Sequence, residues 1–442
     1  MKVKVMLKKV AIIIAALIII LLAAAAVLPK FFKKEIETKI KSAINGNLNA
    51  KVDFKDIDLS LITSFPNLGI EINSLTIIGV DSFAKDTLAN VNQLKLNVNL
   101  LSVISGDKYE IKSVYLNQPK IFAQVLKSGK ASWDIMKVDS ATIKTDTSKT
   151  GFKVALQKYT IENGKVIYDD ATLGFFMELD SLEHTGKGDF TQDLFTLKTQ
   201  SDIKKVTVKY GGIPYLNKVK LVADLPLDID TKAMKFTFAE NKIQLNELIL
   251  SAVGYLAMPN SSDIAMDFKF DAKQSELKNF LSLIPAIYVS NFKDMEASGS
   301  FAMSGTAKGI YNEKSLPSFN ANLAIEHGKI KYPSLPSAIN NIRVEAQVSN
   351  PDGLIDHTTV NVPSFHLEFG SVPVDDRLLL KNPASDPFLD MALKGKLDLK
   401  QLTTIFPMKD MLLSGILDAD IQAAGKKSSI DKGQFCSEWL IK

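Results

Sequence analysis

Hydrophobic and polar residues alternate along most of the chain after residue 51. The clearest set of apolar positions with a period of two is Leu94, Leu96, Val98 and Leu100. The same alternation returns in residues 219–229, 264–270, 319–325, 342–348 and 389–393. Strict alternation gives a strand one apolar and one polar face, which is typical of antiparallel sheets with one face in water. The pattern therefore predicts a mostly β protein.

Few segments of this region have helical spacing. Residues 275–283 and 399–405 are the two candidates. Two short helices cannot cover the apolar face of many strands, so the sheet must curl or pack against another sheet. We predict an elongated antiparallel β-sheet with a few short helices, either curled into a groove or packed as a sandwich. Alternation does not distinguish an open groove from a closed sandwich, because both bury one face.

A short motif occurs twice in the β-rich region. Residues 161–168 read IENGKVIY, and residues 325–332 read IEHGKIKY. We interpret each copy as a strand, a tight turn and a strand. Gly164 and Gly328 would lie in the turns, which need residues that tolerate positive φ. Repetition over so long a period indicates an elongated array of units.

The repeat and the local composition predict four regions after residue 50. Residues 51–138 form an N-terminal β segment. Residues 139–150 are rich in Thr, Ser, Lys and Asp and form a linker. The first repeat unit, with a helix, covers residues 151–294, and the second covers residues 295–442.

Residues 10–28 contain no charged residue and predict a transmembrane helix. A helix of this length spans roughly 28 Å, about the thickness of the hydrocarbon core of a bilayer. Lysines in residues 1–9 suit a cytoplasmic N-terminus, but lysines also follow the segment, so charge alone leaves the orientation open. A cleaved signal peptide is the alternative, although the apolar part of such peptides is usually shorter.

Residues 29–50 predict a short amphipathic helix. Apolar residues recur at every fourth position, at Phe32, Ile36, Ile40, Ile44 and Leu48. This helix either packs against the domain that follows or lies on the membrane surface.

Composition argues against nucleic acid as a partner. The chain has 53 basic and 49 acidic residues and a net charge of +4. Only Arg343 and Arg377 are arginines, although arginine is the usual reader of phosphate and of guanine edges. The single cysteine, Cys436, excludes an intrachain disulfide.

Motifs for catalysis, cofactors or metals are missing from the sequence. There is no glycine-rich phosphate loop, and the four histidines lack metal-ligand spacing. Asp375 and Asp376 are adjacent carboxylates, but neighbouring residues of a strand point to opposite faces and do not converge on one substrate. We therefore expect no catalytic, cofactor-binding or metal site, and no enzymatic activity.

The order of several segments resembles a known family. These segments are residues 47–54 (NLNAKVDF), 59–68 (LSLITSFPNL), 105–112 (SGDKYEIK), 129–135 (GKASWDI) and the two I-E-x-G-K motifs. Together with the basic start and the apolar segment, they resemble the AsmA-like family proteins of Bacteroidetes-type bacteria. The resemblance covers nearly the whole chain.

The resemblance implies a location and a function. It implies a single-pass inner-membrane protein, anchored by residues 10–28 with its bulk in the periplasm. It also implies kinship with AsmA, TamB and the repeating-β-groove lipid transporters, which have no catalytic residues to carry over. The expected function is phospholipid handling between membranes for outer-membrane biogenesis, with membrane lipids as partners. Leu94, Leu96, Val98 and Leu100 are the candidate groove lining, and ordinary core packing is the alternative for each.

Other functions fit the same pattern. The chain could be an assembly or regulatory factor for outer-membrane protein targeting or insertion that carries no lipid, with outer-membrane assembly proteins as partners, or a periplasmic scaffold. Relatives of this type continue for further repeats, so we expect the unit at residues 295–442 to be truncated.

Overall fold

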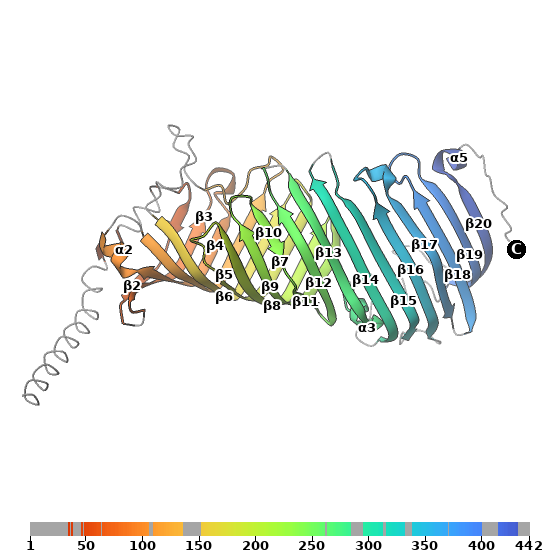
Figure 1. Ribbon diagram of the computed structural model, residues 1–442, viewed down its shortest axis with the longest axis horizontal. Coiled ribbons are helices and arrows are strands. Elements are labelled where there is room, and N and C mark those ends of the chain that lie inside the picture. Colours follow the sequence, from red (N-terminus) through yellow and green to blue (C-terminus); the bar gives the residue numbers. More distant parts are fainter. Residues whose placement is uncertain are drawn as a thin grey trace, which may run out of the picture. The chain divides into compact units, whose positions relative to one another are not determined.

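The computed structural model in Figure 1 describes most of the β-rich region. It describes residues 34, 35, 37, 38, 46, 48–62, 64–105, 109–135, 152–260, 263–283, 295–312, 315–331, 338–369, 371–399 and 414–431. The predicted transmembrane helix at residues 10–28, most of the predicted amphipathic helix, the linker at residues 139–150 and Cys436 lie outside them. Within these ranges, no helix is both long and apolar enough to span a bilayer.

The chain forms two compact units, Met1–Ile213 and Pro214–Lys442. The division falls inside residues 151–294, which the sequence suggested as one repeat unit. Both units consist mainly of long strands (Figure 1). The prediction of a mostly β protein with few short helices is confirmed.

The first unit is a single sheet in which sequence neighbours pair. Two short edge strands, β1 and β2, both pair with β3, and β3 to β8 then follow in order. The strands are β1 (Lys51–Asp53), β2 (Asp56–Ser60), β3 (Asn67–Ile78), β4 (Thr87–Asn99), β5 (Tyr109–Val125), β6 (Phe152–Asp170), β7 (Phe175–Lys187) and β8 (Leu194–Tyr210). Helix α2 (Leu100–Ser105) follows β4.

One pairing in this sheet corrects the prediction of an antiparallel sheet. Strands β5 and β6 run parallel, with Leu116 beside Ile161 and Ile121 beside Val166. Parallel neighbours need a long crossover connection. Residues 126–151, which include the predicted linker, separate these two strands in sequence, so the sheet is mixed.

The second unit is also a sheet of sequence neighbours. Its strands are β9 (Ile213–Asp230), β10 (Lys235–Phe238), β11 (Lys242–Leu245), β12 (Leu248–Ala257), β13 (Ile264–Glu276), β14 (Glu296–Tyr311), β15 (Ser318–Lys331), β16 (Ile339–Asn350), β17 (Thr359–Phe369), β18 (Val372–Lys381), β19 (Phe388–Asp398) and β20 (Ile416–Lys426). Both β10 and β11 lie between β9 and β12. All pairings recorded between strands of this unit are antiparallel.

Helices in the second unit are short. Helix α3 (Leu277–Leu281) lies within the predicted helical segment 275–283, and α5 (Lys427–Asp431) follows β20. The other predicted helix, at residues 399–405, lies outside the described residues except for residue 399.

The repeated motif does not form a tight turn, so that prediction is wrong. Strands β6 and β15 run without a break through Gly164 and Gly328. The residue before each glycine has the positive φ, +47° at Asn163 and +51° at His327. Pairing with the neighbouring strands shifts at both places, which identifies a β-bulge with one extra residue.

The two glycines are needed for close approach. A Cβ atom on Gly164 would lie 2.7 Å from Cγ2 of Ile161, and one on Gly328 would lie 2.8 Å from Cβ of Ile342. Real Cβ atoms essentially never come within 3.0 Å of another heavy atom. Glycine is therefore required at these positions by space, while the polar residue before it supplies the left-handed conformation.

Similar irregularities lie in neighbouring strands of the first unit. Residues with positive φ interrupt four of its strands, at Ser74, Gln118, Asn163 and Ser181. They are aligned, because the pairs Asn73–Gln93, Gln93–Asn117 and Asn117–Glu162 lie just beside the first three. Each of these residues adds one position between successive apolar residues of its strand. The backbone turns at that position, so the apolar side chains before and after it lie on the same face of the sheet.

Candidate functional site

The four predicted lining residues meet in one apolar cluster of the first unit. Leu94 pairs with Ile72 and Leu116, and Leu96 pairs with Ile70 and Val114. The cluster has a buried centre of Phe54, Ile57, Leu68, Ile70, Ile72, Leu75, Val91 and Val98. Val98 is only 4% exposed, whereas Leu94, Leu96 and Leu100 are half-buried at its margin. Strands β2 to β5 therefore share one continuous apolar face.

The opposite face of the same strands is a polar network. Lys95 Nζ lies 3.4 Å from Glu71 Oε2, and Gln93 donates a hydrogen bond of 2.6 Å to Glu71. Asn97 donates one of 2.8 Å to Ser113 Oγ. Each of these residues alternates with a member of the apolar cluster, so the sheet has one face for water and one for apolar contacts.

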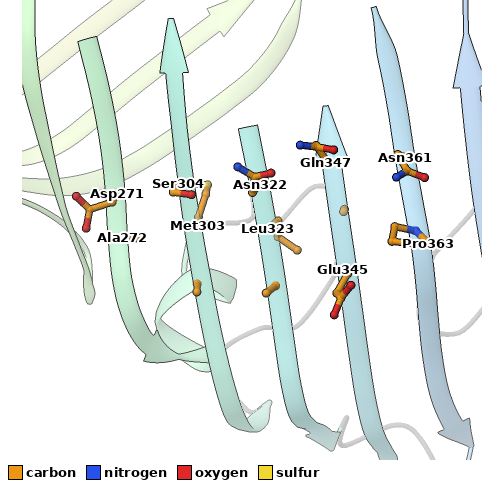
Figure 2. A pocket seen from close by; sticks show the side chains of 13 residues that line it. Asp271, Ala272, Met303, Ser304, Asn322, Leu323, Glu345, Gln347, Asn361 and Pro363 are labelled. Atoms are coloured by element: carbon orange, nitrogen blue, oxygen red, sulfur yellow. The ribbon is translucent and has the colours of Figure 1, made fainter. Parts of the chain in front are cut away.

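The second unit has a cavity on its sheet. The cavity has a volume of about 490 Å³ and is lined by residues of β13 to β17 (Figure 2). Met303 and Leu323 contribute apolar surface, and they pair directly across β14 and β15. Ala272 and Ala346 extend this apolar row to the strands on either side.

The next row of the cavity lining is polar. It runs in register across five strands through Asp271, Ser304, Asn322, Gln347 and Asn361 (Figure 2). Adjacent residues of a strand point to opposite faces, so this polar row lies on the face opposite Met303 and Leu323. Ala302, Ala324 and Glu345 alternate in the same way and share the face of the polar row, so most of the cavity lining belongs to the polar face. The second unit thus repeats the separation of faces that the first unit has.

Helix α3 packs against one end of the apolar face in the second unit. The rings of Phe280 and Phe301 are stacked with centroids 4.3 Å apart. Leu248, Leu277 and Phe301 are fully or almost fully buried there. Met303 and Leu323 pack against this cluster but are only partly buried, so the apolar face continues from the helix along β14 and β15.

The apolar face also extends along the later strands of the second unit. Successive pairings join Val344 to Phe365, Asp376 to Leu393 and Leu393 to Ile421. Phe365 pairs with Asp376, so one carboxylate lies within this apolar row. Its neighbour Asp375 lies on the other face, where Nδ1 of His366 is 2.7 Å from its carboxylate.

The sequence correctly separated Asp375 and Asp376 onto opposite faces but missed the surroundings of Asp376. Those surroundings come from strands β17 and β19, and their register with β18 is not readable from the pattern of one strand. The only signal in the sequence was that Val374, Asp376, Leu378 and Leu380 alternate, which puts the carboxylate in an apolar series.

A partly buried histidine in the first unit has a partner at each ring nitrogen. Nε2 of His184 lies 3.1 Å from the Tyr159 hydroxyl, and Nδ1 lies 2.8 Å from Ser201 Oγ. Burial lowers the pKa of His184 and raises the pKa of Tyr159. Both ring nitrogens have hydrogen-bond partners, so the neutral imidazole needs no further ligand.

The described residues contain no group of three His, Cys, Asp or Glu side chains placed to hold a metal ion. The chemistry that these surfaces offer is therefore apolar contact on one face and hydrogen bonding on the other.

Comparison with known proteins agrees with this architecture. The model of the AsmA family matches residues 4–283. No curated protein and no solved structure matches the chain. The family match covers more than half of the 442 residues, from the N-terminal segment through helix α3. The chain therefore belongs to the AsmA family.

Proposed function

We propose that this protein holds the acyl chains of phospholipids on the apolar faces of its sheets and moves or shelters lipid between the inner and outer membranes. The observation that carries the proposal is that each unit has a continuous apolar face with partly exposed aliphatic side chains. Leu94 and Leu96 provide them in the first unit, and Met303 and Leu323 provide them in the second.

The physical basis is non-directional burial. Each methylene group removed from water contributes about 0.8 kcal/mol, so an acyl chain gains substantially even on a partly open surface. Burial of tails needs no catalytic residue, and the proposal assigns the protein no reaction.

The proposal includes an inner-membrane location, with residues 10–28 as a single anchor and the bulk in the periplasm. Exposed apolar side chains at one end of the first unit support a membrane-facing end. Ile62 is 57% exposed, and Phe65, Leu101 and Ile104 are all more than 70% exposed.

These four residues lie in two connections at the same end of strands β3 and β4. Asn67 at the start of β3 pairs with Asn99 at the end of β4, so the segment before β3 and helix α2 after β4 are neighbours. Large apolar side chains gathered at one rim suit insertion into the interface of the bilayer that residues 10–28 would span.

Photo-crosslinking in cells tests the lipid-binding proposal. A benzoylphenylalanine at Leu96 would lie on the apolar face, and the same probe at Lys95 would lie on the polar face one residue away. We expect ³²P-labelled phospholipid to be crosslinked at position 96 and not at position 95. Crosslinks to proteins alone from both positions would reject lipid carriage and favour an assembly or regulatory factor.

A further inference from the structure

A single carboxylate interrupts the apolar face of the second unit. Asp376 lies in the middle of β18, where Val374 and Leu378 are its neighbours on the same face. Phe365 of β17 pairs with it on one side, and Leu393 of β19 pairs with it on the other.

The surroundings of Asp376 remain apolar beyond these direct neighbours. Val374 pairs with Leu367 and Gly395, and Leu378 pairs with Val362 and Met391. Asp376 is thus enclosed on four sides by side chains that cannot donate a hydrogen bond.

The carboxyl group of Asp376 lacks a side-chain donor. Its Oδ1 atom is buried and has no hydrogen-bond partner among the described residues. Burial raises the pKa of Asp376, against the smaller opposing effects of the backbone N–H and the charge of Arg377. The guanidinium of Arg377 is itself engaged on the other face, where Nη1 lies 2.9 Å from Asp390 Oδ1.

The adjacent residue shows what a satisfied carboxylate looks like on this strand. Oδ1 of Asp375 lies 2.7 Å from Nδ1 of His366, and the Asp375 side chain faces water. The polar face therefore provides partners for its own carboxylates, while the apolar face provides none for Asp376. A buried, unpaired oxygen costs free energy that a bound donor would recover.

We propose that Asp376 binds the primary ammonium group of a phospholipid head group, so that this face prefers lipids of the ethanolamine type. The acyl chains of the lipid lie on the flanking aliphatic rows, and an ammonium N–H donates to the carboxylate of Asp376. A positive charge beside the carboxyl group also favours its ionised form. This inference rests on the proposed function and adds head-group selection to it.

The chemistry separates two zwitterionic head groups. A primary ammonium has three N–H donors, whereas the quaternary ammonium of choline has none. A hydrogen bond to a charged group corresponds to roughly tenfold in binding. The wild-type protein should therefore enrich phosphatidylethanolamine over phosphatidylcholine by about that factor.

The test uses the full chain, purified in detergent and incubated with vesicles of equal parts phosphatidylethanolamine and phosphatidylcholine. Bound lipid is then measured by mass spectrometry for the wild type, Asp376→Leu, Asp376→Asn and Asp375→Leu. Asp375→Leu removes the adjacent carboxylate on the opposite face and is the matched control. Asp376→Asn keeps the size of the side chain and guards against a folding defect in Asp376→Leu.

We expect both Asp376 variants to keep the total amount of bound lipid. Asp376→Leu should lose the preference for ethanolamine and Asp376→Asn should weaken it, because the amide oxygen is an uncharged acceptor, while Asp375→Leu keeps it. An unchanged ratio of the two lipids in both Asp376 variants would overturn this inference and leave the proposed function intact. Absence of any bound lipid from the wild-type protein would overturn the proposed function and this inference together.

Discussion

At the scale of single residues, a glycine can allow two neighbouring strands to approach closely. Gly328 lies in a continuous strand beside His327, which has the positive φ of the bulge. Its missing side chain leaves room for Ile342 on the next strand, since a Cβ atom there would be 2.8 Å from Cβ of Ile342. Gly425 on β20 provides a contrast, because nothing lies within 4 Å of the position of its Cβ.

Replacing Gly328 should therefore destabilise the second unit. Gly328→Ala inserts a methyl group against a partner on a neighbouring strand, and overpacking of this kind typically costs about 1–3 kcal/mol. Gly425→Ala should have little effect on stability. Urea unfolding followed by circular dichroism measures both variants, and equal midpoints for the two would contradict this account of the bulge.

The partly buried ring of His184 should make the first unit sensitive to mild acid. Burial holds the pKa of His184 below its ordinary value of about 6.5 in the folded protein. The unfolded chain therefore binds more protons below that pH, so the free energy of unfolding falls as the pH drops through about 6.5.

His184→Gln tests this dependence, because glutamine keeps hydrogen-bonding groups next to Tyr159 and Ser201 but does not titrate. Urea midpoints at pH 7.5 and pH 5.5 should differ less for the variant than for the wild type. The comparison uses the change with pH, so a uniform loss of stability in the variant does not affect it. The same decrease in both proteins would rule out His184 as the cause.

At the scale of elements, alternation predicted the strands well and their interruptions poorly. Asn163 and Gly164 look like a tight turn, because a turn and a bulge both use a residue with positive φ. Only the register with β5 and β7 distinguishes the two, and register arises from residues far away in sequence. The parallel pairing of β5 and β6 was missed for the same reason.

The sequence predicted which residues of the candidate site share a face, but not the packing around them. Leu94, Leu96, Val98 and Leu100 could be assigned to one face from their spacing alone, and they do join one cluster. Their half-buried or buried state depends on strands β2, β3 and β5, which the spacing does not reveal. The same limit applies to Asp376, whose apolar enclosure is made by two other strands.

Helix α2 and the segment before β3 should contact the membrane. We expect a fluorescent label at Ile104→Cys to be quenched by brominated lipids when the full chain, with Cys436→Ser, is reconstituted into vesicles. The same label at Lys120→Cys is the control, because Lys120 pairs with Asn90 toward the far end of β4 and is exposed. Equal quenching at both positions would contradict a membrane-facing rim at α2.

At the scale of the whole molecule, two units share one design. Each is a sheet of sequence neighbours with an apolar face and a polar face, and the family match covers the first unit and part of the second. Alternation was sufficient to predict a mostly β protein, and the order of several short segments was sufficient to predict its family. The division at Ile213 and Pro214 was not predictable, because the strands on both sides of the turn at Gly211 and Gly212 have similar alternation.

The central claim is that lipid lies on the apolar face of both units, and one set of crosslinking positions tests it. Benzoylphenylalanine is placed at Leu96 and Leu323 on the apolar faces, and at Lys95 and Asn322 on the polar faces. The account predicts phospholipid crosslinks at positions 96 and 323 and none at positions 95 and 322. Crosslinking to phospholipid that is absent at all four positions, or equal on both faces, would contradict it.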